Sequence, residues 1–233
     1  MNFSAAILDE NANGRVSVIP DIKCISPKHG DLLRRRDPVK VAKALVHYGA
    51  PVLSVVTESK KFGGSIDLLR AVSQTTCVPV LRKDFFVHEA QLEESCAAGA
   101  AAVLLICATT KPSLLEKLYE RAIALGLEPL VEVCTEDEMR FAARLGATLV
   151  GINNKNIATY ELDEGCVSRT AKLARLAPEH AVLISESGIC CAEDAKRAAE
   201  AGANAVLVGT ALWQADDMQE KYESLRVRLC GQA

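Results

Sequence analysis

Short apolar segments rich in β-forming residues alternate along the chain with longer segments of helical periodicity. The apolar segments are nearly continuous, which is typical of strands covered on both faces in a parallel sheet. Eight such strands are predicted, over residues 16–22, 52–56, 78–81, 101–106, 127–133, 148–152, 181–184 and 205–208. Between them, helices with one apolar stripe are predicted, among others over residues 38–47, 114–125, 136–144 and 192–201. The alternating pattern of an antiparallel hairpin is missing, so no hairpin is expected.

A glycine-alanine step precedes several of the predicted strands, and glycine there favours the left-handed conformation that ends a helix. The glycines of these steps are Gly49, Gly99, Gly146 and Gly202. Their recurrence indicates repeated αβ units. With eight strands and no linker or charge block, we predict an α/β protein with a single (β/α)8 TIM barrel over residues 1–233. A doubly wound open sheet is the alternative that periodicity leaves open.

Composition narrows the function classes. The 233 residues are 49% hydrophobic and 24% charged, and the formal net charge of -3 provides no broad basic field for nucleic acid. No apolar run approaches the roughly 20 residues that span a bilayer, and residues 1–15 lack the order of a secretory signal, so we expect no membrane association and a cytoplasmic location. The four histidines and nine cysteines show no metal-ligand spacing, so no metal is expected, and most cysteines are expected to be small buried residues in a reducing compartment.

Charged residues occur where barrel strands end, and the carboxyl ends of all strands meet at one mouth. Asp21 and Lys23 are two residues apart, so strand alternation sends both to one side and Ile22 to the other. Lys83 follows an apolar segment, and Glu132 lies within one. Each alone is equally consistent with an ion pair that ties strands together. Together, two buried lysines and two carboxylates predict a proton-transfer site.

Two late turns predict a phosphate site. Ser187 and Gly188 follow the seventh predicted strand, and Gly209 and Thr210 follow the eighth. Barrel enzymes commonly bind phosphate at these turns, because glycine permits close backbone approach and exposed N–H groups favour an anion. Ordinary βα turns are the alternative. Ser26, after the first strand, would add a hydroxyl unless its loop is simply solvated.

Phe62 and Phe85 stand in loops at the same mouth, in a chain with only 4% aromatic residues. They would either enclose an aromatic ring or pack their loops onto the barrel.

These motifs resemble those of indole-3-glycerol phosphate synthases, in order from about residue 18 to residue 209. The matching segments are residues 21–27, 54–58, 80–85, 130–133, 151–155, 185–189 and 208–210. The segment Leu-Arg-Lys-Asp-Phe is the most telling. The resemblance implies closure of the indole ring of 1-(2-carboxyphenylamino)-1-deoxyribulose 5-phosphate, with loss of carbon dioxide and water and with no cofactor. It also implies a phosphorylated small-molecule substrate and contact with other enzymes of tryptophan biosynthesis.

The resemblance implies catalytic roles for five residues. Lys83 would be the general acid that protonates the ribulose carbonyl, and Glu132 would be a general base in the later dehydration. Lys23 would meet the substrate carboxylate, Asn153 would orient Glu132 or a substrate hydroxyl, and Asp21 would be the carboxylate beside them. Substrate binding would fall to Ser26, Phe62, Phe85, Lys155, Glu186, Ser187, Gly188, Gly209 and Thr210.

The chain departs from the family pattern at three places. Family members usually have glutamate at the position of Asp21, and Arg-Asp at the positions of Lys155 and Asn156. They also carry a longer helical extension before the first strand, where this chain has only residues 1–15. All three departures are expected at the aromatic or carboxylate end of the substrate. They leave open a paralogue that acts on a different amine or enol, or a non-catalytic barrel that binds a phosphorylated metabolite.

Overall fold

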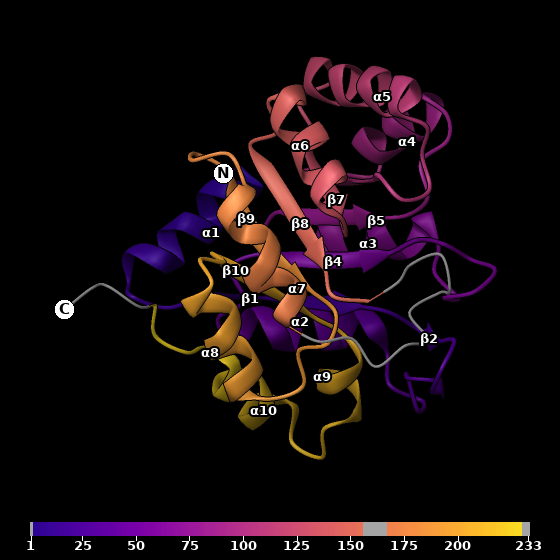
Figure 1. Cartoon of the computed structure of the whole chain (residues 1–233). Coiled ribbons are helices and arrows are strands. Elements are labelled where there is room, and N and C mark those ends of the chain that lie inside the picture. Colours follow the sequence, from indigo (N-terminus) through magenta and orange to yellow (C-terminus); the bar gives the residue numbers. More distant parts are fainter. Residues whose placement is uncertain (1, 156–166, 230–233) are drawn as a thin grey trace.

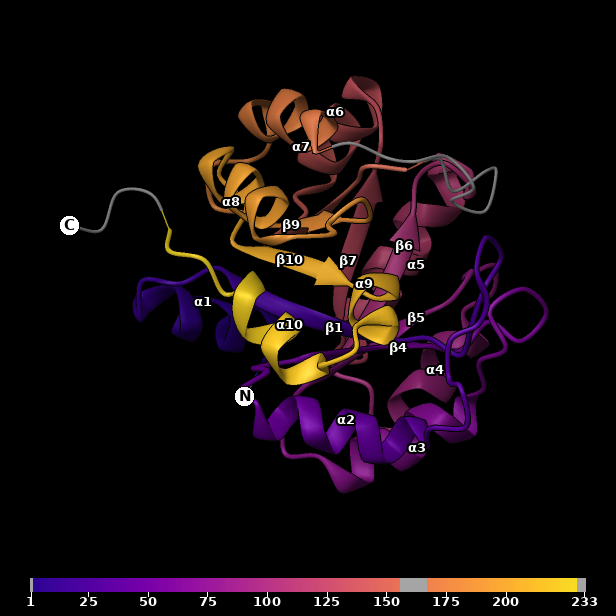
Figure 2. The ribbon, with the colours of Figure 1, turned by 90° about the horizontal axis from the view of Figure 1, so that it is seen from below.

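Eight parallel strands close into a barrel in the computed structural model, which describes residues 2–155 and 167–229 (Figure 1). The first barrel strand pairs with the last on one side and with the second on the other, which completes the closure (Figure 2). The barrel strands are β1 (Ser17–Ile22), β4 (Leu53–Val56), β5 (Val80–Lys83), β6 (Ala102–Ile106), β7 (Glu128–Val133), β8 (Leu149–Asn153), β9 (Val182–Glu186) and β10 (Ala205–Val208). The predicted (β/α)8 fold is thus confirmed. Asn156, Cys166 and Cys230 lie outside the described residues.

Side chains alternate between the barrel interior and the layer beneath the helices, as strand geometry requires. Ile19, Leu104 and Leu130 belong to the interior cluster. Val18 and Ile22 pack instead with helix side chains on the outside. The strands are buried on both faces, which explains their nearly continuous apolar sequence.

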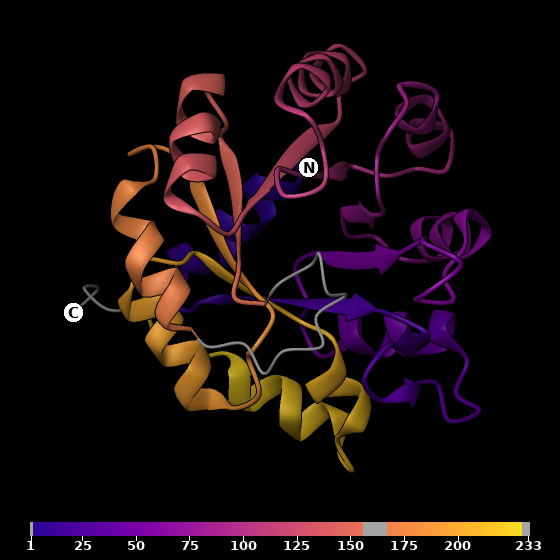
Figure 3. The same cartoon turned by 45° about the vertical axis from the view of Figure 1, so that its right-hand side comes forward.

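Helices form a ring around the strands (Figure 3). They are α2 (Pro38–His47), α3 (Ile66–Thr75), α4 (Ala90–Ala97), α5 (Pro112–Ala124), α6 (Glu136–Leu145), α7 (Ser168–Leu173) with the 3-10 turn η2 (Ala174–Leu176), α8 (Ala192–Glu200), α9 (Thr210–Gln214) and α10 (Met218–Leu225). The four predicted helices are all present, and α2 has the predicted bounds.

Local sequence determines where these helices begin and end. Asp37 accepts hydrogen bonds from the first-turn amides of α2, and Pro38 occupies the position where no amide donor is needed. Thr135 and Glu138 form a reciprocal capping box at the start of α6. Gly146 ends α6 with a φ of 74°, and the glycines of the other three glycine-alanine steps also have positive φ. The predicted left-handed stops are therefore confirmed.

The N-terminal helix α1 (Phe3–Ala12) closes the end of the barrel opposite the mouth. Glu128, the first residue of β7, accepts hydrogen bonds from the amides of Phe3 and Ser4. Phe3 and Ile7 are fully buried in the interior cluster. This segment therefore seals the barrel floor.

Three local features differ from the sequence-based expectations. Strand β9 ends two residues later than predicted, at Glu186. Strand β5 runs two residues later than predicted. Its start is delayed because Pro79 has no amide to donate, and its end is extended because Arg82 and Lys83 continue the strand, with Arg82 pointing outward and Lys83 inward. A small antiparallel pair, β2 (Ile25–Ser26) with β3 (Gly30–Asp31), also follows β1, although no hairpin was expected. Gly30, with a φ of 70°, permits its tight turn, and two residues per strand are too few to show an alternating pattern.

The prediction that most cysteines are buried is wrong for the described part of the chain, where only Cys24 is buried. Cys190 and Cys191, for example, lie in the exposed turn that leads into α8. All seven described cysteines are free thiols. Residues 2–155 and 167–229 contain no His, Cys, Asp and Glu cluster suited to a metal and no helix that could cross a membrane.

Candidate active site

Polar side chains gather at the carboxyl ends of five strands. They are Asp21 of β1 with Lys23 just after it, Lys83 of β5, Glu132 of β7, Asn153 of β8 and Glu186 of β9. As predicted, Asp21 and Lys23 face the mouth together, whereas Ile22 packs under the helices. All except Lys83 are buried, so their charges act in surroundings that weaken electrostatic interactions far less than water does.

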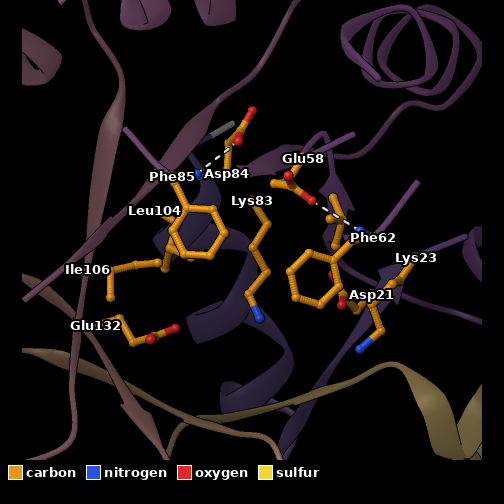
Figure 4. A pocket seen from close by; sticks show the side chains of 11 residues that line it. Asp21, Lys23, Glu58, Phe62, Lys83, Asp84, Phe85, Leu104, Ile106 and Glu132 are labelled. Carbon is orange, nitrogen blue, oxygen red and sulfur yellow. Dashed lines mark hydrogen bonds between the residues drawn. The ribbon is translucent and has the colours of Figure 1, made fainter. Parts of the chain in front are cut away.

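A narrow apolar slot of about 30 Å³ lies at one side of this mouth. Val56, Leu104 and Ile106 contribute apolar wall, and the rings of Phe62 and Phe85 face it on either side of Lys83 (Figure 4). In this view Glu132 lies on the side of Phe85, while Asp21 and Lys23 lie on the side of Phe62. An apolar slot with charges at its edge fits a flat ring that bears a polar substituent.

A carboxylate helps to hold the loop that carries Phe62. Glu58 accepts hydrogen bonds from the amides of Lys60, Lys61 and Phe62, at 3.0, 2.7 and 3.0 Å. Beyond them, Gly64 has no room for a side chain, because a Cβ there would collide with the carbonyl of Val56. These contacts position the Phe62 ring at the slot.

Lys83 reaches from the slot into the mouth, where its Nζ lies 3.4 Å from Oε2 of Glu186. The Glu186 side chain is fully buried. Its carboxylate leans over Gly151 of β8, where a Cβ would overlap Oε1 and would lie 3.1 Å from Cδ. Glycine at this position therefore makes room for the carboxylate beside Lys83. The neighbouring Arg82 points outward and pairs with Asp84 and Glu94, at 3.1 and 2.8 Å. Of these two basic residues, only Lys83 faces the mouth.

Asn153 orients Glu132. Its Nδ2 donates to Oε1 of Glu132 at 3.1 Å, which is one of the two contacts that the resemblance implied. Its Oδ1 accepts from the amide of Lys155 at 2.9 Å. Arg169 of α7 adds support from outside, because its Nη1 donates to the carbonyls of Asn153 and Lys155, at 2.6 and 2.9 Å. The carboxylate of Glu132, a residue only 2% exposed, is thereby held in place.

Asp21 is enclosed from three directions. Oγ of Ser54 donates to its Oδ1 at 2.7 Å, and Nε1 of Trp213 donates to its backbone carbonyl at 2.8 Å. Gly209 lies against it, because a Cβ on Gly209 would approach Asp21 Oδ2 and Cβ to 3.2 and 3.3 Å. The Asp21 carboxylate, one methylene shorter than the glutamate usual in the family, is therefore well supported at the base of the mouth.

A wider cavity of about 480 Å³ opens beside the slot and shares Asp21, Lys23 and Lys83 with it. The two turns that sequence motifs assigned to phosphate form one wall. Its lining includes Ser187, Gly188, Gly209 and Thr210, with Lys28, His29, Lys155 and Lys221 around them. Five lysines and one carboxylate among the lining residues favour a multiply charged anion.

The turn at Ser187 has an uncommon backbone conformation that Asn154 stabilises. Ser187 and Gly188 have φ values of 63° and 70°, which is unfavourable for serine by about 1 kcal/mol or more. Nδ2 of Asn154 donates to the carbonyls of Glu186 and Ser187, both at 3.0 Å. Its Oδ1 accepts from Thr170, which holds the amide in place. Strain of this kind is typical of ligand-binding turns.

Three predicted binding residues have placements that the motifs did not specify. Ser26 is buried, and its Oγ accepts from the amide of His29 at 3.3 Å instead of lining either cavity. Glu186 lies beneath the cavities as the partner of Lys83. Lys155 lines the wide cavity and not the slot, so this departure from the family lies at the anion-binding end.

Sequence reasoning missed three residues that shape the site: Asn154, Trp213 and Lys221. Asn154 stands in a matching motif, but only its neighbour Asn153 was assigned a role. Successive strand residues face opposite sides, so the role of one does not indicate the role of the next. Trp213 is the only tryptophan in the chain, and its indole joins Asp21 to α9. Lys221 had no sequence signal, because it is one of several charged residues on α10.

Two cysteines near the mouth are unsuited to nucleophilic chemistry. Burial, followed by the charge of Glu138, raises the pKa of Cys107 to about 12. Burial and a hydrogen bond to Glu138 raise the pKa of Cys134 to about 12 as well. Their thiols remain protonated at neutral pH, and the thiolate is the nucleophilic form.

Carboxylates and lysines beside a lysine-lined cavity, at the mouth of a closed barrel, are the arrangement typical of a (β/α)8-barrel enzyme that uses acid–base chemistry. The family described as indole-3-glycerol phosphate synthase matches residues 1–225. The indole-3-glycerol phosphate synthase of Pyrococcus furiosus is 45% identical over 203 residues, which are 87% of this chain and 88% of that relative. That of Kineococcus radiotolerans is 45% identical over 202 residues, 87% of this chain and 73% of the relative.

This chain therefore belongs to the indole-3-glycerol phosphate synthase family, and it is a carboxy-lyase of that type. A solved thiamine phosphate pyrophosphorylase from Pyrococcus furiosus also shares the fold, with a TM-score of 0.66 over 90% of this chain and 93% of that one. Its sequence is only 16% identical, so this likeness concerns the fold alone.

Proposed function

We propose that the barrel mouth closes the indole ring of 1-(2-carboxyphenylamino)-1-deoxyribulose 5-phosphate in tryptophan biosynthesis. The observation that carries this proposal is the position of Lys83. Its side chain borders both the aromatic slot and the wide cationic cavity, and its Nζ lies 3.4 Å from Glu186. A substrate with an aromatic ring at one end and a phosphate at the other would place its central carbonyl at this border.

In this proposal the two ends of the substrate bind in the two cavities. The carboxyphenyl ring enters the slot between Phe62 and Phe85, and Lys23, which borders both cavities, meets its carboxylate. The phosphate lies against the turns at Gly188 and Gly209, where amide groups and nearby lysines favour an anion.

Lys83 acts as the general acid for ring closure. The ring carbon that bears the carboxylate attacks the ribulose carbonyl carbon, and the Lys83 ammonium donates a proton to the carbonyl oxygen as the carbon–carbon bond forms. Loss of carbon dioxide leaves its bonding electrons in the ring and restores aromaticity. Glu186 lies beside the ammonium and stabilises its charged form before transfer.

Glu132 acts in the dehydration that follows. The Lys23 ammonium donates the proton with which the new hydroxyl leaves as water, and Glu132 removes a proton from the neighbouring carbon to form the double bond of the indole. Asn153 holds the Glu132 carboxylate through a 3.1 Å hydrogen bond, so the base is preorganised at the mouth. Asp21, supported by Ser54, is the carboxylate near Lys23 that assists proton movement at this end. These steps need no cofactor.

Indole fluorescence tests the proposal directly. Purified protein mixed with the carboxyphenylamino substrate should develop the emission of indole-3-glycerol phosphate, and expression should rescue growth of a tryptophan auxotroph lacking its own synthase. Folded protein that binds inorganic phosphate but forms no indole would refute the assigned substrate and favour a paralogue acting on a different amine or enol.

The proposal extends to the enzyme's surroundings. We place it in the cytoplasm, in contact with other enzymes of tryptophan biosynthesis, on the basis of its family. Cell fractionation and crosslinking in a producing strain would test these two assignments.

A further inference from the structure

Helix α10 brings a lysine to the anion-binding cavity from a part of the chain that carries no site motif. Tyr222 and Leu225 are fully buried and anchor the helix to the barrel layer. Asp217 caps its start by accepting from the amide of Glu220 at 2.9 Å. With the helix anchored in this way, the half-buried Lys221 lines the wide cavity together with the turn at Ser187.

The charge of Lys221 reaches that turn. Partial desolvation of its thiol is the main cause that raises the pKa of Cys190, and Asp194 adds to it, while the charges of Lys155 and Lys221 act in the opposite direction. Cys190 also lines the wide cavity, three residues after Ser187. The Lys221 ammonium therefore acts on the wall that includes the phosphate turn.

Within residues 2–155 and 167–229, no carboxylate lies within ion-pair distance of Lys221. By contrast, Lys196 on the neighbouring helix α8 has Glu200 at 3.9 Å. A lysine that lines a cavity without a carboxylate partner has an ammonium available for an anionic ligand, and its partial burial reduces screening by solvent.

We propose that Lys221 is a further substrate-binding residue, which contacts the phosphate group from the α10 side. The proposal rests on the proposed function, because it assumes that the wide cavity takes the phosphate end. Lys221 lines the same cavity as the phosphate turns and does not line the slot. It should therefore strengthen binding without taking part in proton transfer.

Inorganic phosphate is the probe that isolates this role. By calorimetry, Lys221→Gln should weaken phosphate binding about tenfold, at the lower end for a hydrogen bond to a charged group. Lys221→Arg should retain most of the affinity. The matched control is Lys196→Gln, which makes the same change in net charge on an exposed helix face and should bind phosphate within about twofold of wild type.

Steady-state kinetics give a second readout. Lys221→Gln should raise KM for the carboxyphenylamino substrate and leave kcat nearly unchanged, because uniform binding energy is lost. Phosphate affinity equal in Lys221→Gln and wild type would overturn the assignment, as would an equal loss in Lys196→Gln, which would indicate only a general charge effect. If wild type makes no indole but the calorimetric difference persists, the proposed substrate fails and the role of Lys221 stands.

Discussion

A methyl group at position 151 would collide with the buried carboxylate that lies beside Lys83. In Gly151→Ala the added carbon would overlap Oε1 of Glu186 and lie 3.1 Å from its Cδ and 3.4 Å from Cδ1 of Leu130. Glu186 is fully buried, and strand β9 fixes its backbone. The carboxylate must therefore move away from β8, and its 3.4 Å contact with Lys83 must change.

Two magnitudes follow from this displacement. Overpacking of a close-packed interior costs about 1 to 3 kcal/mol, so the free energy of unfolding should fall by that amount. For a chain of this size the melting temperature should fall by about 2 to 4 °C for each kcal/mol. A misplacement of about 1 Å at reacting groups costs on the order of a hundredfold in rate, so kcat should fall by a similar factor.

Urea unfolding and indole-forming kinetics measure both effects, and a double-mutant cycle isolates their cause. In the Glu186→Ala background the carboxylate is gone, so adding Gly151→Ala should cost less than about 0.5 kcal/mol. If Gly151→Ala lowers stability equally in both backgrounds, the collision is not with Glu186. Wild-type stability and kcat in the single variant would refute the packing argument outright.

Three further predictions concern single side chains. Lys83→Ala should lower turnover by at least about a hundredfold while phosphate affinity by calorimetry stays nearly unchanged, because general acid catalysis is typically worth 10² to 10⁴; parallel losses would indicate a structural ion pair. Asp21→Glu should preserve or raise indole formation, because the cavity of about 480 Å³ beside Asp21 accommodates one more methylene. Loss of most activity would show that the site is shaped for aspartate and not for glutamate. Tyr222→Phe should raise the free energy of unfolding by about 1 kcal/mol in urea titrations, because the buried hydroxyl has no hydrogen-bond partner within the described residues. A clear loss of stability would instead reveal a partner for that hydroxyl.

The sequence alone determined the repeat of strands and helices. Eight apolar segments separated by amphipathic helices require a parallel sheet covered on its outer face, and left-handed glycines mark the helix ends independently of tertiary contacts. Since the carboxyl ends of all barrel strands share one mouth, Asp21, Lys83 and Glu132 could be grouped before any contact was known.

Only the tertiary structure decided what each of these groups faces. Ser26 and Lys155 follow strands just as Ser187 does, but in hairpin β2–β3 the Ser26 hydroxyl accepts from the His29 amide, whereas Lys155, after β8, lines the wide cavity. Glu186 pairs with Lys83 because Gly151, 35 positions earlier, leaves space for its carboxylate. Lys221 reaches the cavity because α10 is anchored by Tyr222 and packs beside α9. Such placements depend on packing between segments distant in sequence, and local periodicity carries no information about it.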